Sequence, residues 1–167
     1  MMTRTSSRLA AHVHPFHSRD LDDVLAIEQE SFSAPWTRRM FAAELQGNPF
    51  SRFLGAFCDD EMPPAKRLLG YICYWVVFDE LRLMNLAVRP DCRRQGIASH
   101  LVRHAAEEGV TQGATRALLE VRAGSHLGQK LYLNLGFRPY GRRRSYYTNP
   151  DEDAILMHRQ LAEHVQS

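Results

Sequence analysis

Apolar and polar residues alternate along the chain with two different periods. In four stretches the apolar side chains recur every three or four residues, which is typical of amphipathic helices. Elsewhere, short runs of β-branched and aromatic residues are bounded by turn-forming residues, which predicts strands. The expected helices span 18–32, 35–49, 97–108 and 125–137, and the expected strands span 52–58, 67–78, 80–88, 115–122, 137–147 and 153–161.

The order of these elements predicts an α+β fold built on a mixed, mostly antiparallel sheet of six to seven strands with four helices. The strand–helix–strand unit over 80–122 implies one parallel pair of strands, because such a crossover returns the chain in the same direction. The helices do not alternate regularly with the strands, so a doubly wound dinucleotide-binding fold is excluded.

Local signals set the ends and the inner faces of the shorter helices. Thr37 is a suitable N-cap for the second helix, with Met40 and Phe41 expected to face inward. Gly136 is expected to end the last helix, because glycine readily adopts the left-handed conformation found there. The inner face of that last helix is predicted to carry Leu127, Leu131 and Leu135.

The composition is that of an ordinary globular protein. Hydrophobic residues make up 44% and charged residues 24% of the 167 positions, and this length fits a single domain. We expect that domain at 13–161, after a polar leader at 1–12 and before a tail at 162–167. No apolar run approaches the roughly 18–20 residues of a membrane span, and the start lacks the apolar core of a secretion signal. No membrane association is therefore expected.

Charge and potential metal ligands narrow the function further. A net charge of +2 is too small to argue for direct binding to nucleic acid. Cys58, Cys73 and Cys92 are widely spaced and form no metal or redox motif, so we expect reduced thiols in a cytoplasmic protein. His100 and His104 are four residues apart but lack the acidic partner of a zinc-protease motif. Surface histidines and no metal are the expectation.

The stretch "VRPDCRRQGIASHLV" (88–102) carries the chain's most specific chemical signal. A strand ends at Val88, three arginines follow, and Gly96 opens a helix. The first turn of a helix has unpaired N–H groups and partial positive charge, which suits a phosphate. A solvated arginine turn explains the same local pattern equally well. The segment is neither a P-loop nor a dinucleotide fingerprint.

The run Arg93-Arg94-Gln95-Gly96-Ile97-Ala98 resembles the cofactor signature R/Q-x-x-G-x-G/A of the GCN5-related N-acetyltransferases (GNAT). The similarity continues through "PWTRRMF", "LLEVRAGSHLGQKLYLNLGF" and "RRRSYYTNPDEDAILM", and covers nearly all of 13–161. These strings are similar to the bacterial ribosomal-protein-alanine N-acetyltransferases. The resemblance implies the GNAT fold, with its central parallel strands splayed around acetyl-CoA.

The resemblance also assigns the acetyl-CoA contacts. The strand end would pair with the pantetheine arm through its backbone, and the following turn would hold the pyrophosphate. Arg89 lies before the motif and can be a solvated turn residue. The implied cofactor-binding residues are Leu86, Ala87, Val88, Arg93, Arg94, Gln95, Gly96, Ile97, Ala98, Ser99 and Ser125.

Acetyl transfer to an amine requires a base for the amine and an acid for the departing thiolate. From the residues alone, Glu120 would be a solvent-facing strand residue and Tyr132 a half-buried core tyrosine. The resemblance implies instead that Glu120 is the base and Tyr132 the acid. The sequence departs from the family pattern at Ser125, where asparagine is usual, and at Gly128 and Lys130, where small apolar residues are usual. Serine can cap the helix, but it is shorter than asparagine and has fewer hydrogen-bonding groups to offer the cofactor.

The resemblance implies an amine acceptor, foremost the N-terminal alanine of a small-subunit ribosomal protein. The walls of its site are expected from Trp36, Tyr146, Tyr147, Glu152 and Asp153, which are otherwise exposed hairpin and helix residues. Two alternatives remain. The same chemistry can act on a free amino acid, a polyamine or a lysine, or the chain can be a non-catalytic acyl-CoA-binding module.

Overall fold

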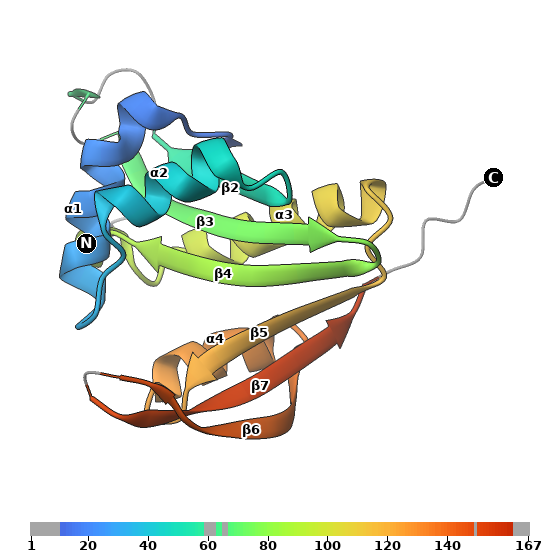
Figure 1. The fold of residues 1–167 in the computed structure, drawn as a ribbon. Coiled ribbons are helices and arrows are strands. Elements are labelled where there is room, and N and C mark those ends of the chain that lie inside the picture. Colours follow the sequence, from blue (N-terminus) through green and yellow to red (C-terminus); the bar gives the residue numbers. More distant parts are fainter. Residues whose placement is uncertain (1–10, 59–62, 65–66, 149, 162–167) are drawn as a thin grey trace, which may run out of the picture.

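The computed structural model describes residues 11–58, 63–64, 67–148 and 150–161. They form one seven-stranded sheet of order β1-β2-β3-β4-β5-β7-β6, in which only β4 and β5 are parallel (Figure 1). This confirms the predicted α+β class. The strands are β1 (His12–His14), β2 (Ser51–Phe57), β3 (Leu68–Val77), β4 (Glu80–Val88), β5 (Arg116–Arg122), β6 (Arg138–Tyr147) and β7 (Glu152–Gln160).

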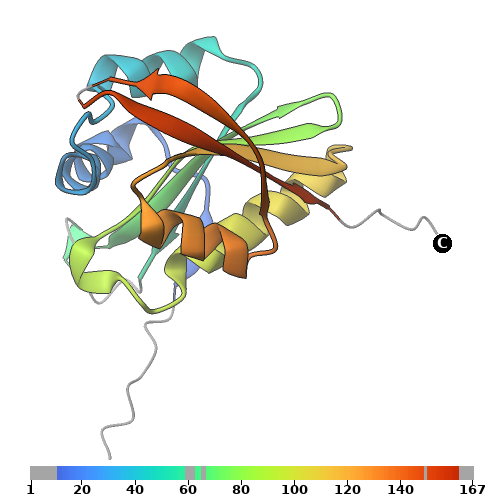
Figure 2. The same cartoon turned by 90° about the horizontal axis from the view of Figure 1, so that it is seen from below.

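Helices cover both faces of the sheet. One core cluster joins α1 and α2 to one face, and a second joins α3 and α4 to the other, as the two ribbon views show (Figures 1 and 2). The helices are α1 (Leu21–Ser31), α2 (Arg38–Gly47), α3 (Ile97–Thr111) and α4 (His126–Asn134). Short 3-10 turns precede α1 (η1, Ser18–Asp20) and α3 (η3, Pro90–Cys92).

The parallel strands β4 and β5 pair over only three residues each. Residues 80–82 face 116–118, and the two strands then separate, so that they form the arms of a V in Figure 1. A bulge lies on the β3 side of β4, because Tyr74 pairs with Leu83 while Cys73 pairs with Asn85. Met84 is therefore the extra residue, and a bulge of this kind bends and twists its strand. The predicted splay is confirmed.

The sequence-based element order lacked β1. This short strand pairs antiparallel with β2, and the His14 ring stacks on Phe57 with centroids 4.1 Å apart. His12, expected in the leader, begins this strand. Three residues are too few to give a period, so the pairing depends on a distant segment. Residues 1–10 of the expected leader and the expected tail at 162–167 lie outside the described residues.

Two predicted core positions are wrong, and two predicted helix ends are confirmed. Met40 is 46% exposed and Leu127 is 81% exposed, so neither side chain faces the core. The Thr37 hydroxyl accepts a hydrogen bond from the Met40 N–H at 3.2 Å, so Thr37 is the N-cap of α2. Gly136 follows α4 with a φ of +89°.

Gly70 offers a test of the packing between β3 and β4. A Cβ at this position would lie 2.8 Å from the Ala87 carbonyl oxygen. Because backbone must move to admit it, we expect Gly70→Ala to lower the free energy of unfolding by about 1–3 kcal/mol in urea denaturation. Gly47→Ala is the control, since nothing lies within 4 Å of its Cβ, and we expect equal or higher stability. Unchanged stability of Gly70→Ala would refute this packing.

Candidate functional site

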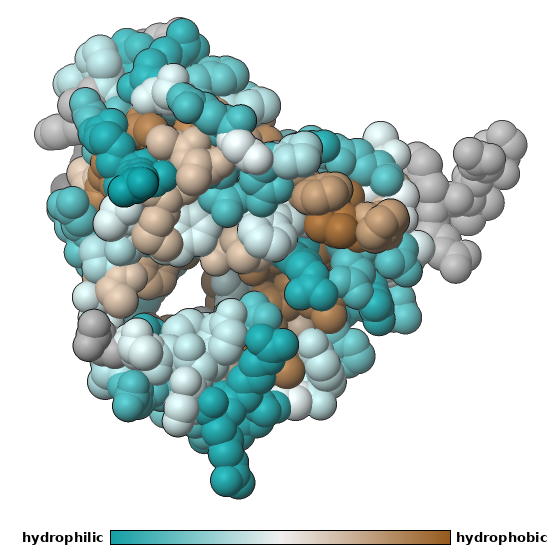
Figure 3. Space-filling view, in the orientation of Figure 1, coloured by the Kyte–Doolittle hydropathy of each residue, from teal (hydrophilic) through white to brown (hydrophobic). Residues whose placement is uncertain are grey.

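The open side of β4 is the first element of the site. Leu86, Ala87 and Val88 pair with β3 on one side, but the ladder to β5 ends at Arg82, before this segment. Backbone groups on the β5 side therefore lack a strand partner there, and Figure 3 shows the surface hollowed where the two strands separate. An elongated ligand with amide groups can pair with such an edge as an added strand would.

The turn at 93–99 leads directly from this edge into α3. Gly96 is the N-cap of α3 with a φ of +80°, and no side chain caps the helix there. Nothing lies within 4 Å of the position a Cβ would take at Gly96, so the approach to its backbone is open. The amides of Ile97, Ala98 and Ser99 occupy the first turn of a 15-residue helix, where an anion is favoured.

The arginines near this turn have different surroundings. Arg93 and Arg94 are exposed, and Arg93 donates hydrogen bonds to the Val88 carbonyl (3.1 Å) and the Ser31 hydroxyl (3.3 Å). The expectation that Arg89 is merely solvated is wrong. It donates to both carboxylate oxygens of Asp91, at 2.9 and 2.6 Å, and these hydrogen bonds lower the pKa of Asp91 to about 2. Arg89 thus stabilises η3 through its ion pair with Asp91.

The side chains of Ile97 and Gln95, which complete the predicted turn, are not fully exposed to solvent. The Ile97 side chain is buried in the core beneath α3, so only its backbone faces the N-terminal end of the helix. Gln95 is half-buried beside Gly96. Any phosphate contact from these two positions therefore falls mainly to the backbone N–H groups.

Glu120 lies on the face of β5 opposite α3. Leu119 and Val121 are buried in the cluster around α3, so the alternation of side chains places Glu120 on the side of α1 and α2. It is half-buried and pairs in register with Leu156 of β7. The carboxylate therefore lies on the α1 and α2 side of β5 and is only partly exposed to solvent.

Tyr132 approaches from α4, on the other side of the sheet. Its ring packs edge-on against Phe137 at 5.8 Å, and it lies at the margin of the core cluster. Burial, and secondarily the charge on Tyr147, raise the pKa of Tyr132 above the ordinary value of 10.0. The phenol therefore carries its proton at neutral pH, and burial makes it a weaker acid than an exposed tyrosine.

Tyr147 is electrostatically coupled to both predicted catalytic residues. Burial, followed by the charge of Glu120, raises its pKa to about 12, and its own charge raises the pKa of Tyr132. The Arg122 guanidinium lies 4.3 Å from the centre of the Tyr147 ring and 3.7 Å from Glu152. This cluster joins β5, β6 and β7 on one side of the opening.

The remaining predicted wall residues have mixed roles. Tyr146 is exposed beside Tyr147, with ring centroids 5.0 Å apart. Asp153 is engaged within its own hairpin, where it accepts from Arg142 at 2.7 Å and from the Ser145 N–H at 2.8 Å. Trp36 is half-buried on the opposite side, with its ring 5.1 Å from that of Phe41.

Ser125 does not act as the expected capping side chain. It occupies the N-cap of α4, but its hydroxyl makes no capping hydrogen bond. That hydroxyl lies over Gly128, where an added Cβ would come within 2.7 Å of it. The two departures from the family pattern therefore fit each other sterically. Instead, Gln129 anchors α4 by donating to the carbonyls of Arg122 (3.1 Å) and Ala123 (2.8 Å).

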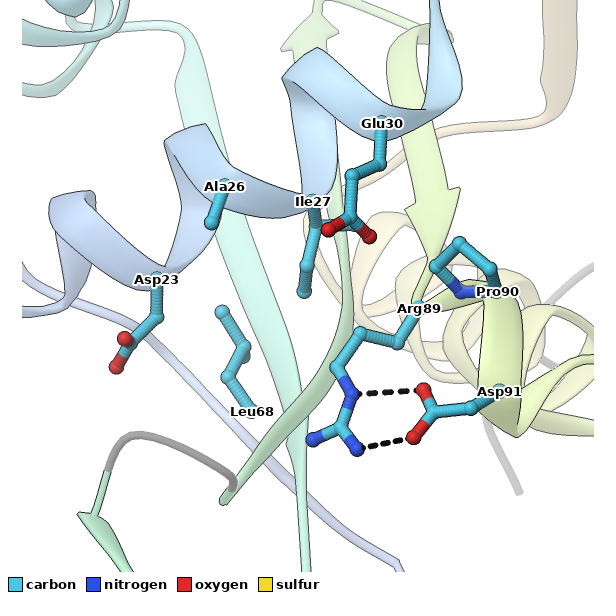
Figure 4. Close-up of a pocket in the computed structure, with 8 residues that line it drawn as sticks. All are labelled: Asp23, Ala26, Ile27, Glu30, Leu68, Arg89, Pro90 and Asp91. Atoms are coloured by element: carbon cyan, nitrogen blue, oxygen red, sulfur yellow. Dashed lines mark hydrogen bonds and ion pairs between the residues drawn. The ribbon is translucent and has the colours of Figure 1, made fainter.

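A separate pocket of about 390 Å³ lies between α1 and η3 (Figure 4). Its lining includes Asp23, Glu30 and Asp91, and its one cation, Arg89, is paired with Asp91. Burial and then its acidic neighbours raise the pKa of Asp23. Three carboxylates around one neutralised arginine repel an anion, so this pocket is not the phosphate site.

Within the described residues, no group of three or more metal-ligating side chains is found. No helix in the described part of the chain is both long and apolar enough to span a membrane.

Residues 21–137 match the acetyltransferase (GNAT) family, and the chain belongs to this family. It is therefore an acetyl-CoA-dependent N-acetyltransferase, as are the relatives named below.

Curated relatives are similar over nearly their whole length. The putative ribosomal protein bS18-alanine N-acetyltransferase of Bacillus subtilis (strain 168) is 37% identical, with 88% of this chain and 93% of that protein covered. The ribosomal protein bS18-alanine N-acetyltransferase of Escherichia coli (strain K12) is 33% identical, with 87% and 94% covered.

Solved structures share the architecture. The crystal structure of the ribosomal-protein-S18-alanine N-acetyltransferase from Escherichia coli has a TM-score of 0.79 at 30% identity, covering 95% of this chain and 98% of that one. Ard1 from Thermoplasma volcanium has a TM-score of 0.81 at 24% identity, covering 93% and 100%, which shows the shared fold.

The two glycines that flank α3 allow a matched test of the phosphate site. Gly96 and Gly113 both have positive φ and open space around a would-be Cβ, but they lie at opposite ends of the helix. We expect alanine at either position to lower stability by about 1–2 kcal/mol. Only Gly96→Ala should weaken acetyl-CoA binding, by about tenfold in calorimetry. Equal binding by both variants would contradict this site.

The raised pKa of Tyr147 predicts a stability change at high pH. The folded-state pKa of about 12 exceeds the ordinary value of 10.0, so the contribution is fully present below pH 10 and is lost as pH rises toward 12. In urea denaturation across this range, we expect Tyr147→Phe to lose less stability than the wild type. Glu120→Gln should give an intermediate slope, because it removes one of the two main causes. Parallel curves for all three proteins would exclude the coupling.

Proposed function

We propose that this protein transfers the acetyl group of acetyl-CoA to the N-terminal amine of an alanine that begins a small-subunit ribosomal protein. The observation that carries this acceptor is the similarity, over nearly the full length, to enzymes named for ribosomal protein bS18-alanine acetylation. Modification of a ribosomal protein would place the reaction in the cytoplasm. The acceptor protein is the expected partner, without direct contact to nucleic acid or membrane.

In this proposal the cosubstrate lies along the open edge of β4. Leu86, Ala87 and Val88 would pair with the pantetheine arm through their backbone groups. The pyrophosphate would accept hydrogen bonds from the first turn of α3, with added charge from Arg93 and Arg94. The open ladder and the uncapped helix support this placement. Ser125, at the start of α4, would lie near the same arm.

The acetyl group would pass directly from sulfur to nitrogen. The amine nitrogen bonds to the thioester carbonyl carbon, and the carbon–sulfur bond breaks. Glu120 takes the proton that the amine loses, and Tyr132 gives its proton to the departing thiolate. A backbone N–H near the bulge of β4 would stabilise the negative charge that develops on the carbonyl oxygen. The position of Glu120 on one face and Tyr132 on the other supports these roles.

The acceptor would enter between the Trp36 side and the Tyr147 side of the opening. Tyr146 and Tyr147 would contact the peptide backbone. Glu152, 3.7 Å from Arg122, would favour positively charged residues near the acceptor's N-terminus. These contacts would favour a peptide acceptor over a free amine, because a free amine has no peptide backbone for Tyr146 and Tyr147 to contact.

Two conservative substitutions test the chemistry. We expect Glu120→Gln and Tyr132→Phe each to lower kcat at least about a hundredfold, because each removes one proton-transfer group. Glu107→Gln and Tyr140→Phe are matched controls on exposed positions, and they should retain wild-type rates. Wild-type kcat in either catalytic variant would overturn that residue's assignment.

An acceptor panel tests the substrate by mass spectrometry. It comprises the alanine-initiated N-terminal peptide of ribosomal protein bS18, the same peptide with a blocked N-terminus, free alanine and a polyamine. We expect acetylation of the first peptide at its α-amine alone. Faster turnover of a free amine would select the alternative acceptor class, and cofactor binding without any transfer would indicate a non-catalytic module.

A further inference from the structure

Glu28 is a buried carboxylate that the proposed chemistry does not use. It lies on the inner face of α1, is 1% exposed, and is surrounded by a cluster that includes Val24 and Ile27. An isolated charge in such a place is strongly unfavourable unless hydrogen bonds compensate it. The helical spacing places residue 28 at a core position, where an apolar side chain is expected. The neighbouring residues in the sequence therefore do not explain a carboxylate there.

Three donors from three separate elements compensate this carboxylate. The backbone N–H of Trp36 donates to Oε1 at 2.9 Å, and the side-chain amide of Asn85 donates to Oε2 at 2.9 Å. The Tyr71 hydroxyl also donates to Oε2. Burial, and then the charge of Glu28, raise the pKa of Tyr71. All three partners donate, so an acceptor-only side chain is required at this position.

Two of these donors belong to opposite sides of the proposed site. Trp36 lies in the link between α1 and α2, and its ring packs on Phe41, which contacts Tyr71 in turn with ring centroids 5.9 Å apart. Asn85 lies on β4 immediately before the segment 86–88. Glu28 therefore joins the proposed acceptor wall to the proposed cofactor strand through a single carboxylate.

The bulge at Met84 is what presents Asn85 to Glu28. Leu83 faces the cluster beneath α3, whereas Met84 packs in the cluster beneath α1 and α2. Asn85, the next residue, also faces α1, because its amide reaches Glu28. In a regular strand, two consecutive side chains would face opposite sides. The distortion that accompanies the splayed sheet thus also creates this contact.

We propose that Glu28 is a positioning residue that fixes Trp36 relative to β4 and so sets the geometry of the acceptor site. The inference rests on the proposed function, since Trp36 is the proposed acceptor wall. Glu28 contacts neither substrate. Its effect is on where the amine is held relative to the thioester, and therefore on acceptor affinity more than on acetyl-CoA affinity.

Glu28→Gln tests this role against a matched control. Glutamine keeps the shape but turns an NH2 group toward at least one of the three donors. Glu108→Gln is the control. Glu108 of α3 accepts from the hydroxyl of Tyr74 at 2.6 Å, and Tyr74 lies on β3, as Tyr71 does, but faces the other side of the sheet. We expect the acceptor KM to rise about tenfold in Glu28→Gln only, with acetyl-CoA binding within about twofold of wild type.

A readout independent of turnover follows Trp36 directly. The chain has two tryptophans, so Trp75→Phe leaves Trp36 as the sole indole. In that background, we expect acrylamide to quench Trp36 fluorescence more strongly after Glu28→Gln and unchanged after Glu108→Gln. If the wild type acetylates no peptide, the proposed function fails, and this quenching measurement alone decides whether Glu28 positions Trp36.

Two further variants keep the test decisive if Glu28→Gln does not fold. Asn85→Ala cuts the link to β4 and should raise the acceptor KM, whereas Tyr71→Phe removes one donor but keeps the ring that contacts Phe41, and should not. An unchanged acceptor KM together with unchanged Trp36 quenching in Glu28→Gln would overturn the proposal. Without a folded Glu28→Gln, equal acceptor KM in Asn85→Ala and Tyr71→Phe would do the same.

Discussion

The separation of β4 from β5 after three pairs of residues is the constraint on which the rest of the site depends. It leaves the segment 86–88 of β4 without a strand on one side, where the Val88 carbonyl accepts from Arg93, and it opens the middle of the sheet. Glu120 lies on one face of β5 beside this space, and Tyr132 lies on α4, which covers the other face. The uncapped start of α3 lies at the end of the same edge, so a single elongated ligand can meet both features.

The bulge at Met84 connects this opening with the buried polar cluster of Glu28. A carboxylate that joins three elements restricts where the α1–α2 link can lie relative to β4. On the other side, Arg122 holds Tyr147 and Glu152 together across β5, β6 and β7. The opening thus lies between two side-chain clusters, one in the buried core around Glu28 and one of half-buried residues on β5, β6 and β7.

Much of this architecture could be predicted from the sequence, because long elements carry clear periods. The strands at 67–88 and the helix from Ile97 are examples, and the crossover between β4 and β5 implied their parallel pairing. The strand β1 could not be predicted, because three residues carry no period. The exposure of Leu127 was missed because spacing alone does not reveal where a short helix leaves the sheet.

The candidate site was less predictable than the fold. The residues of the 93–99 turn could be proposed from the sequence because they are contiguous, whereas roles for Glu120 and Tyr132 could be proposed only through the family resemblance. The role of Glu28 could not be predicted, since its donors Trp36, Tyr71 and Asn85 are separated from it by 8, 43 and 57 residues. The ion pair of Arg89 with Asp91 was missed for a different reason, because arginines in turns are usually solvated.

The most direct test of the central claim is amide hydrogen exchange with and without acetyl-CoA. If the open edge of β4 and the first turn of α3 hold the cosubstrate, acetyl-CoA will slow exchange in 83–88 and 96–99 and leave β1 and β2 unchanged. Protection confined to other segments, such as the pocket between α1 and η3, or no protection at saturating acetyl-CoA, would contradict the account.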